Sequence, residues 1–319
     1  MKLRNVISRT IIPAIVAVVG FPVNAMAEDA LTEFRIGYQK NGTLVVARQQ
    51  QKIETALEEK GISVKWVEFS SGPPLLEAVN VGSIDFGTTG DTPPIFAQAA
   101  GANIVYVATQ PSPGTGSAIL VHQDSEIRIL SDLKGKKVGF TKGSSANNLT
   151  VEALIKGGLT YNDIEPVYLS PADAAAAFVR KSIDAWTIWD PYYAIAETKQ
   201  NAQVLTTGEP IVATNSFLLA NGDFARKHPD TVSRVISALS EAANWAEANR
   251  DKVAEALADV TGVDLQSQTR AAERASFGIY PITQDIIKTQ QTIADRFYEI
   301  GLIPKKITIR DAIWNAPQS

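Results

Sequence analysis

Apolar and polar positions alternate along the chain in a pattern that predicts short strands, each followed by a helix. In a first block, buried strands are predicted at residues 33–38, 63–69 and 84–87, and helices at 44–60, 74–81 and 93–100. In a second block, strands are predicted at 137–140, 166–168 and 183–188, and helices at 146–157 and 172–179. Strands that alternate with helices indicate a parallel, doubly wound α/β sheet, so we expect two such sheets in two lobes.

A short internal echo supports the idea of two related blocks. The tripeptide Ser83-Ile84-Asp85 begins eight residues before Asp91, and Ser182-Ile183-Asp184 begins eight residues before Asp190. Each tripeptide follows a predicted helix and leads through a strand to a helix start that contains proline. This shared context predicts a duplicated supersecondary unit.

The segments between the blocks predict how the lobes are joined. Apolar strands at 118–121 and 216–220 are expected to cross between the lobes and to form a two-strand hinge. Lobe 1 is then 28–120 together with 221–319, and lobe 2 is 121–220. The tail has helical spacing at 230–249, 251–260, 265–277 and 283–300, and we expect it to return to lobe 1. The alternative is a separate helical third domain.

The N-terminus has the pattern of a secretory signal. Lys2, Arg4 and Arg9 precede an apolar run at 11–21, and Ala25 and Ala27 provide the small residues of a cleavage site, so residues 1–27 are expected to be removed. A membrane anchor would need about 20 apolar residues, more than this run contains. No later stretch is long enough, so we expect an exported, soluble protein.

Composition narrows the compartment and the partners. The sequence has no cysteine, which excludes disulfides, thiolate metal sites and a lipid-attachment cysteine, and so favours a Gram-negative periplasm without a lipid anchor. Removing residues 1–27 takes away three of the 30 basic residues and none of the 34 acidic ones, so the net charge changes from −4 to −7. This balance disfavours nucleic acid. The net negative charge does not attract an anion at long range, so local hydrogen-bond donors must bind it.

Four loops join a predicted strand to the next helix and contain glycine or hydroxyl residues. They are 39–43 and 87–94 in lobe 1, and 141–148 and 187–192 in lobe 2. Ligands of open α/β sheets bind at this end of the strands, and helix starts present free N–H groups to anions. The structural alternative is that Ser144, Ser145, Asp91 and Asp190 are ordinary helix caps. None of the loops has the phosphate-loop pattern, so nucleotide binding is not expected.

The chain offers little for catalysis. Its two histidines are His122, at the end of a predicted hinge strand, and His228, at a predicted helix start. Neither lies beside a nucleophile motif, and no spacing of ligating residues indicates a metal site. We therefore expect a binding protein without a cofactor, not an enzyme.

Several segments resemble the aliphatic-sulfonate-binding proteins of ABC importers. They are Tyr38-Gln39-Lys40, Trp66-Val67-Glu68-Phe69, residues 80–85, residues 90–102, Lys142-Gly143-Ser144-Ser145, residues 184–193 and residues 302–306. The resemblance covers nearly all of the mature chain and implies a class II periplasmic-binding-protein fold. It also implies a small anionic ligand, and an inner-membrane permease with its ATPase as partners; we expect a monomer. Taurine- and nitrate-binding relatives share this scaffold and remain alternatives, as does an enzyme of the same fold acting on a sulfur- or pyrimidine-containing substrate.

The resemblance also implies which residues contact the ligand. They are Gln39, Thr89, Gly90, Ser144, Ser145, Asn147, Trp189 and Asp190. Neutral donors are expected to hold the sulfonate without an arginine, while Trp189, Tyr192 and Tyr38 supply apolar walls for its alkyl tail. Because side chains alternate along a strand, we expect Trp186 in the core and Trp189 in the cleft. Asp190 is expected to cap a helix, since an acid beside an anion is costly.

Overall fold

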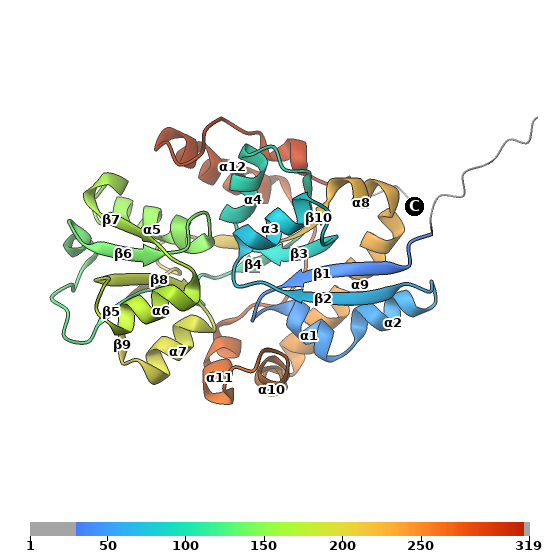
Figure 1. Cartoon of the computed structure of the whole chain (residues 1–319), viewed down its shortest axis with the longest axis horizontal. Coiled ribbons are helices and arrows are strands. Elements are labelled where there is room, and N and C mark those ends of the chain that lie inside the picture. The colour runs from blue at the N-terminus through green and yellow to red at the C-terminus, as the bar shows by residue number, and fades with distance from the viewer. Residues whose placement is uncertain (1–29, 316–319) are drawn as a thin grey trace, which may run out of the picture. The chain divides into compact units, whose positions relative to one another are not determined.

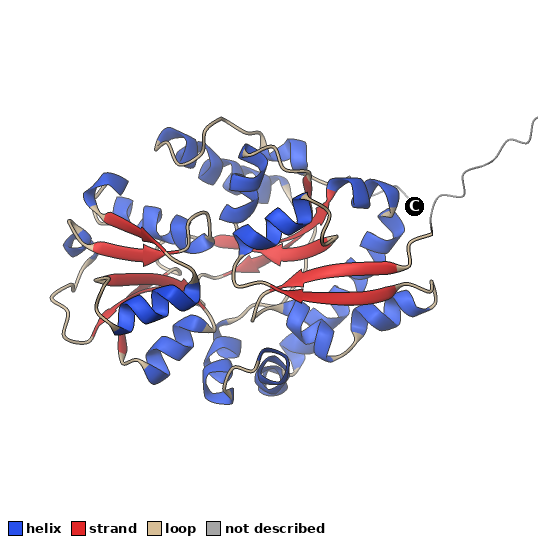
Figure 2. Ribbon diagram, viewed as in Figure 1, coloured by secondary structure: helices blue, strands red, loops and turns tan. Residues whose placement is uncertain are grey.

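The computed structural model describes residues 30–315, so the predicted signal sequence lies outside the described residues. Two five-stranded sheets carry the fold (Figures 1 and 2). The first sheet has the order β2 (Ser63–Glu68), β1 (Glu33–Tyr38), β3 (Phe86–Thr89), β10 (Thr214–Asn221), β4 (Ile104–Ser112). The second has the order β7 (Glu165–Tyr168), β6 (Lys137–Phe140), β8 (Ala185–Trp189), β5 (Ser117–His122), β9 (Ala202–Thr207). The predicted α/β architecture with two sheets is confirmed.

The helices lie on the faces of the two sheets (Figure 2). Those of the first block are α1 (Thr43–Gln49), α2 (Lys52–Glu58), α3 (Gly72–Asn80) and α4 (Thr92–Ala99). Those of the second block are α5 (Ser145–Lys156), α6 (Pro171–Val179) and α7 (Tyr192–Lys199). The tail forms α8 (Gly222–Lys227), α9 (Pro229–Ala248), α10 (Arg250–Thr261), α11 (Leu265–Arg274) and α12 (Gln284–Glu299). Short 3₁₀ turns occur at Leu130–Leu133, Tyr161–Asp163 and Ile309–Ala312.

The two sheets repeat one topology. In each sheet three neighbouring strands are parallel (β2, β1 and β3; β7, β6 and β8), and the fourth and fifth strands run antiparallel to their neighbours. In both sheets the carboxyl ends of the parallel strands therefore lead into loops, among them those that precede α4, α5 and α7. This edge is where the fold can present a ligand site.

The echoed Ser-Ile-Asp tripeptides make the same hydrogen bonds in both sheets. The Asp85 carboxylate accepts from the N–H of Arg35 at 2.8 Å, while the Asp85 N–H donates to the Arg35 carbonyl. Asp184 and Lys137 exchange the same two bonds, with the carboxylate contact at 2.7 Å. Each aspartate thus fixes the first strand of its block beside the third, so the repeated tripeptide has the same structural role in both sheets.

Several elements differ from the sequence prediction. The predicted helix 44–60 is two helices, because Gln51 adopts a left-handed conformation (φ 53°) that ends α1 and re-aims α2 so that Ile53 and Leu57 are buried. Strands β4 and β9 and the short helix α8 were not predicted. Each of these three elements lies beside a segment that the sequence predicted as a loop or as a crossing between the lobes.

The predicted hinge strands do not cross between the sheets. Strand β5 lies wholly in the second sheet and β10 wholly in the first, so the chain passes between the sheets at residues 113–116 and 208–213. These two passing segments touch where the N–H of Gly208 donates to the carbonyl of Gly114 at 3.1 Å. A Cβ at Gly208 would lie 2.8 Å from that carbonyl oxygen, so the contact requires a residue without a side chain.

The tail returns to the first sheet with one exception. Helix α9 packs on α1 and α2, α10 packs on α1, and α12 packs on α4. Helix α11 packs on α10 and also on α7, which follows the second sheet (Figure 1). A buried apolar cluster on the other side joins α4, α5 and α12 through Ile95, Val151 and Phe297.

The duplicated aspartates lead to a stability prediction. Asp85 is 5% exposed and also accepts from the Arg35 guanidinium, whereas Asp184 is more exposed and makes only the backbone contacts. We expect Asp85→Ala to lower the free energy of unfolding by roughly 2–3 kcal/mol and Asp184→Ala by about 1 kcal/mol, because hydrogen bonds to buried charge cost more to lose. Urea titration measures both, and equal losses would contradict this account.

Candidate functional site

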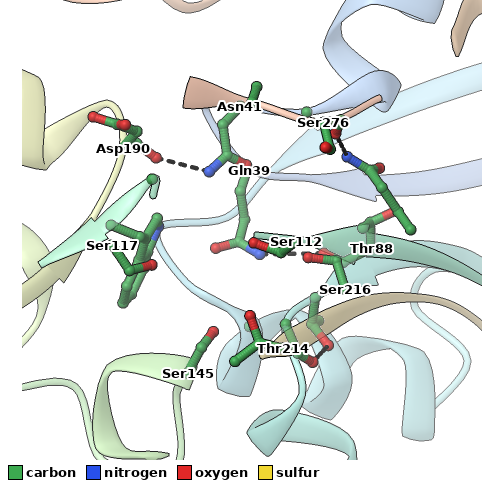
Figure 3. A pocket seen from close by; sticks show the side chains of 18 of the residues that line it. Gln39, Asn41, Thr88, Ser112, Ser117, Ser145, Asp190, Thr214, Ser216 and Ser276 are labelled. Atoms are coloured by element: carbon green, nitrogen blue, oxygen red, sulfur yellow. Dashed lines mark hydrogen bonds between the residues drawn. The ribbon is translucent and has the colours of Figure 1, made fainter. Parts of the chain in front are cut away.

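A cavity of about 150 Å³ lies between the loops of the two sheets (Figure 3). Residues of the first sheet and its loops line one part of it, including Gln39, Asn41, Thr88, Thr89, Gly90 and Ser112. Residues of the second sheet line another part, including Ser117, Ser144, Ser145, Trp189 and Asp190. Ala271, Arg274 and Ser276, in and after α11, also contribute. The cavity therefore lies at the carboxyl ends of the parallel strands, as the topology requires.

Seven of the eight predicted contact residues come together in this cavity. They are Gln39, Thr89, Gly90, Ser144, Ser145, Trp189 and Asp190. Asn147 is fully buried and is not among the lining residues. Its side-chain oxygen accepts from the N–H of Gly143 at 3.1 Å, so Asn147 shapes the loop before α5 from beneath.

Gly90 and Ser145 lie close to each other at the cavity wall. A Cβ built at Gly90 would lie 2.1 Å from the Ser145 hydroxyl oxygen, so a side chain at position 90 would force Ser145 to shift. The neighbouring Ser144 hydroxyl donates to the Thr141 carbonyl at 2.7 Å and holds the loop. Ser145 is the first residue of α5, whose leading N–H groups have no partner within the helix. A hydroxyl and free N–H donors thus meet where the two sheets come together.

The loop after β1 contributes amide side chains. Gln39 Nε2 donates to the Thr88 carbonyl at 3.2 Å, and Asn41 Nδ2 donates to the Asp190 carbonyl at 2.7 Å (Figure 3). The Asn41 bond connects a loop of the first sheet to the second sheet. Sequence analysis placed Asn41 in a candidate loop but did not predict it as a contact residue.

The tryptophans are placed as alternation along β8 predicts. Trp186 is 1% exposed in the core of the second sheet, and Trp189 is partly exposed and lines the cavity. The other predicted apolar walls are wrong: Tyr38 and Tyr192 are not among the lining residues. Tyr38 is drawn away by Glu68 and Arg48, which contact its hydroxyl, while Leu44, Pro93 and Leu257 supply apolar surface.

Two aspartates occupy corresponding places after β3 and β8. Asp91 is fully buried, and its carboxylate accepts from Thr92 Oγ1 at 2.9 Å and from Asn148 Nδ2 at 2.7 Å. Burial raises the pKa of Asp91 to about 6. Asp190 Oδ1 accepts from the N–H of Ala194 at 3.0 Å, which confirms the predicted cap on α7. Burial raises the pKa of Asp190 to about 7, against the opposing charge of Arg274.

Arg274 also lines the cavity, although the sequence did not predict it as a contact residue. Among the residues that the structure describes, the charged ones lining the cavity are Asp91, Asp190 and Arg274. Arg274 Nη1 lies 3.5 Å from Asp190 Oδ1, and Nη2 contacts Glu197. The prediction that neutral donors hold the ligand without an arginine therefore concerns a cavity that also has an arginine in its lining. A helical pattern in the tail gave no sign that this arginine reaches the second sheet.

The arrangement of hydrogen-bond donors in the cavity can bind an anion. Hydroxyls and amides surround the cavity, and the described residues contain no group of three or more His, Asp or Glu side chains placed to hold a metal. His122 Nε2 lies 3.0 Å from the Ile183 carbonyl and its ring stacks on Phe178, away from the cavity lining. Within residues 30–315, no helix is both long and apolar enough to cross a membrane.

Comparison with known proteins places this fold and site in a class. The NMT1/THI5-like family model matches residues 57–253. A protein of Escherichia coli (strain K12) named for binding aliphatic sulfonates is 44% identical over 294 residues, which is 92% of each chain. The chain therefore belongs to the NMT1/THI5-like family and groups with its aliphatic-sulfonate-binding members.

Solved structures agree with this placement. The alkanesulfonate-binding protein SsuA from Xanthomonas axonopodis pv. citri, bound to MOPS, has a TM-score of 0.85 and 41% identity, and the match covers 89% of this chain and 98% of that one. The periplasmic aliphatic sulphonate binding protein SsuA from Escherichia coli has a TM-score of 0.81 and 43% identity, with 90% and 94% covered. The desulfurization enzyme DSZB, at 16% identity and a TM-score of 0.65, shares the fold alone.

The raised pKa of Asp91 predicts a pH dependence of stability. Because the folded protein holds the Asp91 proton more tightly than the unfolded chain, this group stabilises most below about pH 4, and the contribution is lost as the pH rises through about 6. Between about pH 4 and pH 6, ionisation of Asp91 is expected to lower the free energy of unfolding by roughly 2–3 kcal/mol. We expect Asp91→Asn to remove this decrease, because asparagine does not ionise. Urea titrations at pH 4, 5, 6 and 7 compare the slopes, and parallel profiles of variant and wild type would contradict it.

Proposed function

We propose that this protein binds an aliphatic sulfonate in the cavity between its two sheets and delivers it unchanged to an ABC permease and its ATPase in the inner membrane. The observation that carries the proposal is the meeting of Gly90 and Ser145, which brings the start of α5 against a loop of the first sheet at the cavity wall. The names of the relatives support the choice of ligand. No chemical step is needed.

The chemistry of a sulfonate matches the donors in the cavity. Its head is a permanently ionised group with three acceptor oxygens, and hydrogen bonds to charged groups contribute about 1.5–3 kcal/mol each. The Ser145 hydroxyl and the N-terminal N–H groups of α5 offer such donors without a cation. Trp189, Leu44 and Pro93 offer apolar surface for the alkyl tail. Binding near micromolar affinity requires about 8 kcal/mol, which a few such bonds and the apolar contacts can supply after the entropic costs of binding.

The signal pattern at residues 1–27 and the periplasmic relatives support export to the periplasm, and the absence of cysteine supports a form without a lipid anchor. The lobes that enclose the ligand are 28–120 with 221–319, and 121–220. The strand order of the sheets supports placing the two lobe boundaries at 113–116 and 208–213, where Gly114 and Gly208 are in contact. Closure of these lobes on a ligand would then present one composite surface to the permease.

Taurine is the competing ligand that one observation favours. Asp190 Oδ2 is buried and has no hydrogen-bond partner among the described residues, and an amino group could donate to it. The carboxylate already faces Arg274 at 3.5 Å through Oδ1, so an added ammonium would compete with the guanidinium. Because Arg274 already occupies this side of the Asp190 carboxylate, we propose an alkanesulfonate and not taurine as the ligand.

Titration calorimetry with ethanesulfonate, taurine, sulfate and nitrate tests the proposed ligand. We expect one ethanesulfonate to bind per chain, and sulfate and nitrate to bind at least tenfold more weakly because they offer no alkyl group to the apolar wall. A preference for nitrate, or no binding of any sulfonate, would overturn the specificity. Release of sulfite from a sulfonate by the pure protein would favour an enzyme.

A pair of adjacent serines separates binding from loop structure. Ser145→Ala removes the hydroxyl that faces Gly90, so we expect at least tenfold weaker ethanesulfonate binding, about 1.4 kcal/mol, with little loss of stability. Ser144→Ala removes the bond to the Thr141 carbonyl and should act more on thermal stability than Ser145→Ala does. If Ser145→Ala leaves the affinity unchanged, this serine is not a ligand contact.

A further inference from the structure

Helix α11 reaches the second sheet through polar contacts. It follows α10 in the tail, yet its Ser267 hydroxyl lies 3.1 Å from the Thr198 hydroxyl on α7. Lys199 Nζ, also on α7, donates to Gln266 at 3.3 Å. These contacts connect segments that are about 70 residues apart in the sequence and pack on different sheets.

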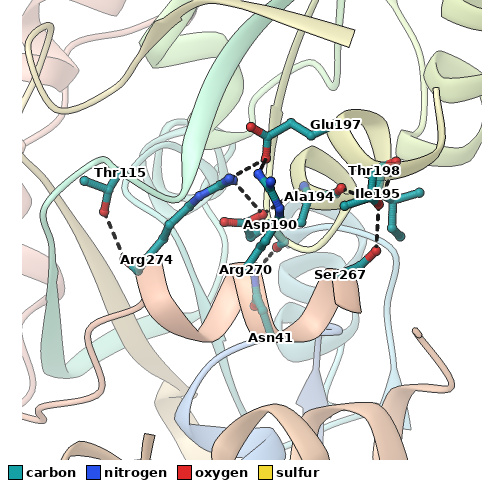
Figure 4. A network of polar contacts seen from close by, with 10 residues as sticks. All are labelled: Asn41, Thr115, Asp190, Ala194, Ile195, Glu197, Thr198, Ser267, Arg270 and Arg274. Carbon is teal, nitrogen blue, oxygen red and sulfur yellow. Dashed lines mark hydrogen bonds and ion pairs between the residues drawn. The ribbon is translucent and has the colours of Figure 1, made fainter. Parts of the chain in front are cut away.

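Arg274 lies at the centre of this contact. Its guanidinium contacts Glu197 and Asp190 (Figure 4). It also stacks over the Tyr193 ring, 3.9 Å from the ring centre. The side chains of Arg274, Glu197 and Asp190 are only 18%, 17% and 8% exposed. The Thr115 hydroxyl donates to the Arg274 carbonyl at 2.9 Å, beside a segment that passes between the sheets. We call the polar contacts between α11 and α7 that surround Arg274 the α11 clasp.

The opposite edge of the cavity is held by apolar packing. Ile95 of α4, Val151 of α5 and Phe297 of α12 belong to one buried cluster. Arg296 of α12 also pairs there with Glu152 of α5, so this edge carries a cross-sheet ion pair of its own. Separating buried apolar surface exposes it to water, whereas polar partners regain hydrogen bonds to water when they separate. We therefore take the α11 clasp as the edge that opens.

We propose that Arg274 is a positioning residue that holds the cleft closed through Glu197 and Asp190, and thereby sets the rate at which the ligand leaves. This inference rests on the proposed function, in which a ligand is enclosed between the two sheets. Asp190 joins the clasp to the cavity, because its carboxylate faces Arg274 while its carbonyl accepts from Asn41 across the cavity wall. The apolar edge at α4, α5 and α12 acts as the side that stays closed.

Stopped-flow kinetics with ethanesulfonate test the clasp, with Trp189 in the cavity wall as a fluorescence reporter. We expect Arg274→Gln to raise the dissociation rate constant at least tenfold while the association rate constant changes less than threefold. Arg274→Lys should recover part of this loss, because an ammonium keeps the charge but not the fork-like geometry. Arg296→Gln is the matched control at the apolar edge and should change both rate constants less than twofold.

The variant Glu197→Gln separates a clasp from a direct ligand contact. Glu197 is not among the described residues that line the cavity, and its removal frees the Arg274 guanidinium. A clasp predicts faster dissociation, and the double variant with Arg274→Gln should be no worse than the stronger single variant, because the two residues act as one pair. Slower dissociation in Glu197→Gln would instead assign Arg274 to the ligand and overturn the proposal.

A distance measurement without ligand makes the clasp testable even if no sulfonate binds. Because the chain has no cysteine, spin labels at Ser182→Cys and Glu255→Cys, both exposed, report one distance between the second sheet and α10. Adding Arg274→Gln should shift the distance distribution to longer values, and adding Arg296→Gln should not. Identical distributions in all three proteins would refute the clasp, whereas failure of the wild type to bind any sulfonate would refute only the proposed function.

Discussion

The loop after β3 and the start of α5 meet at residue 90, where the absence of a side chain leaves room for the Ser145 hydroxyl. The Ser145 hydroxyl oxygen lies 2.1 Å from where a Cβ of residue 90 would be, and around this contact the two sheets direct their loops into one cavity. Helix starts that point at a shared space give free N–H groups a common target. A chain with a net charge of −7 after signal removal can in this way offer an anion a local set of donors.

The duplicated unit explains why the two halves of the cavity correspond. Asp85 and Asp184 fix the strand order, and Asp91 and Asp190 then occupy matching places at the far ends of β3 and β8. Asp91 and Asp190 are both buried beside the cavity. Each contacts a residue from the other half of the protein: Asp91 accepts from Asn148, and Asp190 lies opposite Arg274. The same structural position therefore serves twice to connect the sheets, once through an amide and once through an ion pair.

Local pattern predicted the parts of the site that depend on local structure. The alternation that buries Trp186 and exposes Trp189, the cap by Asp190, and the strand-to-helix loops at 87–94 and 141–148 are properties of short segments, and the fold confirms them. Asn147 and Tyr38 belong to predicted segments, but their side chains are engaged by Gly143 and by Glu68 and Arg48, partners that no periodicity specifies. Arg274 reaches the cavity because α11, which packs on α10, also packs on α7, and no local pattern specifies this tertiary contact.

The central claim is that the ligand is held from both sheets at once, at the start of α5 and the loop after β3. The most direct measurement is a crystal structure of the mature protein grown with ethanesulfonate. We predict the sulfonate oxygens within hydrogen-bond distance of Ser145 Oγ and of the first N–H groups of α5, with a further contact to the loop at Thr89 and Gly90. A sulfonate bound elsewhere, or one that contacts residues of a single sheet, would contradict it.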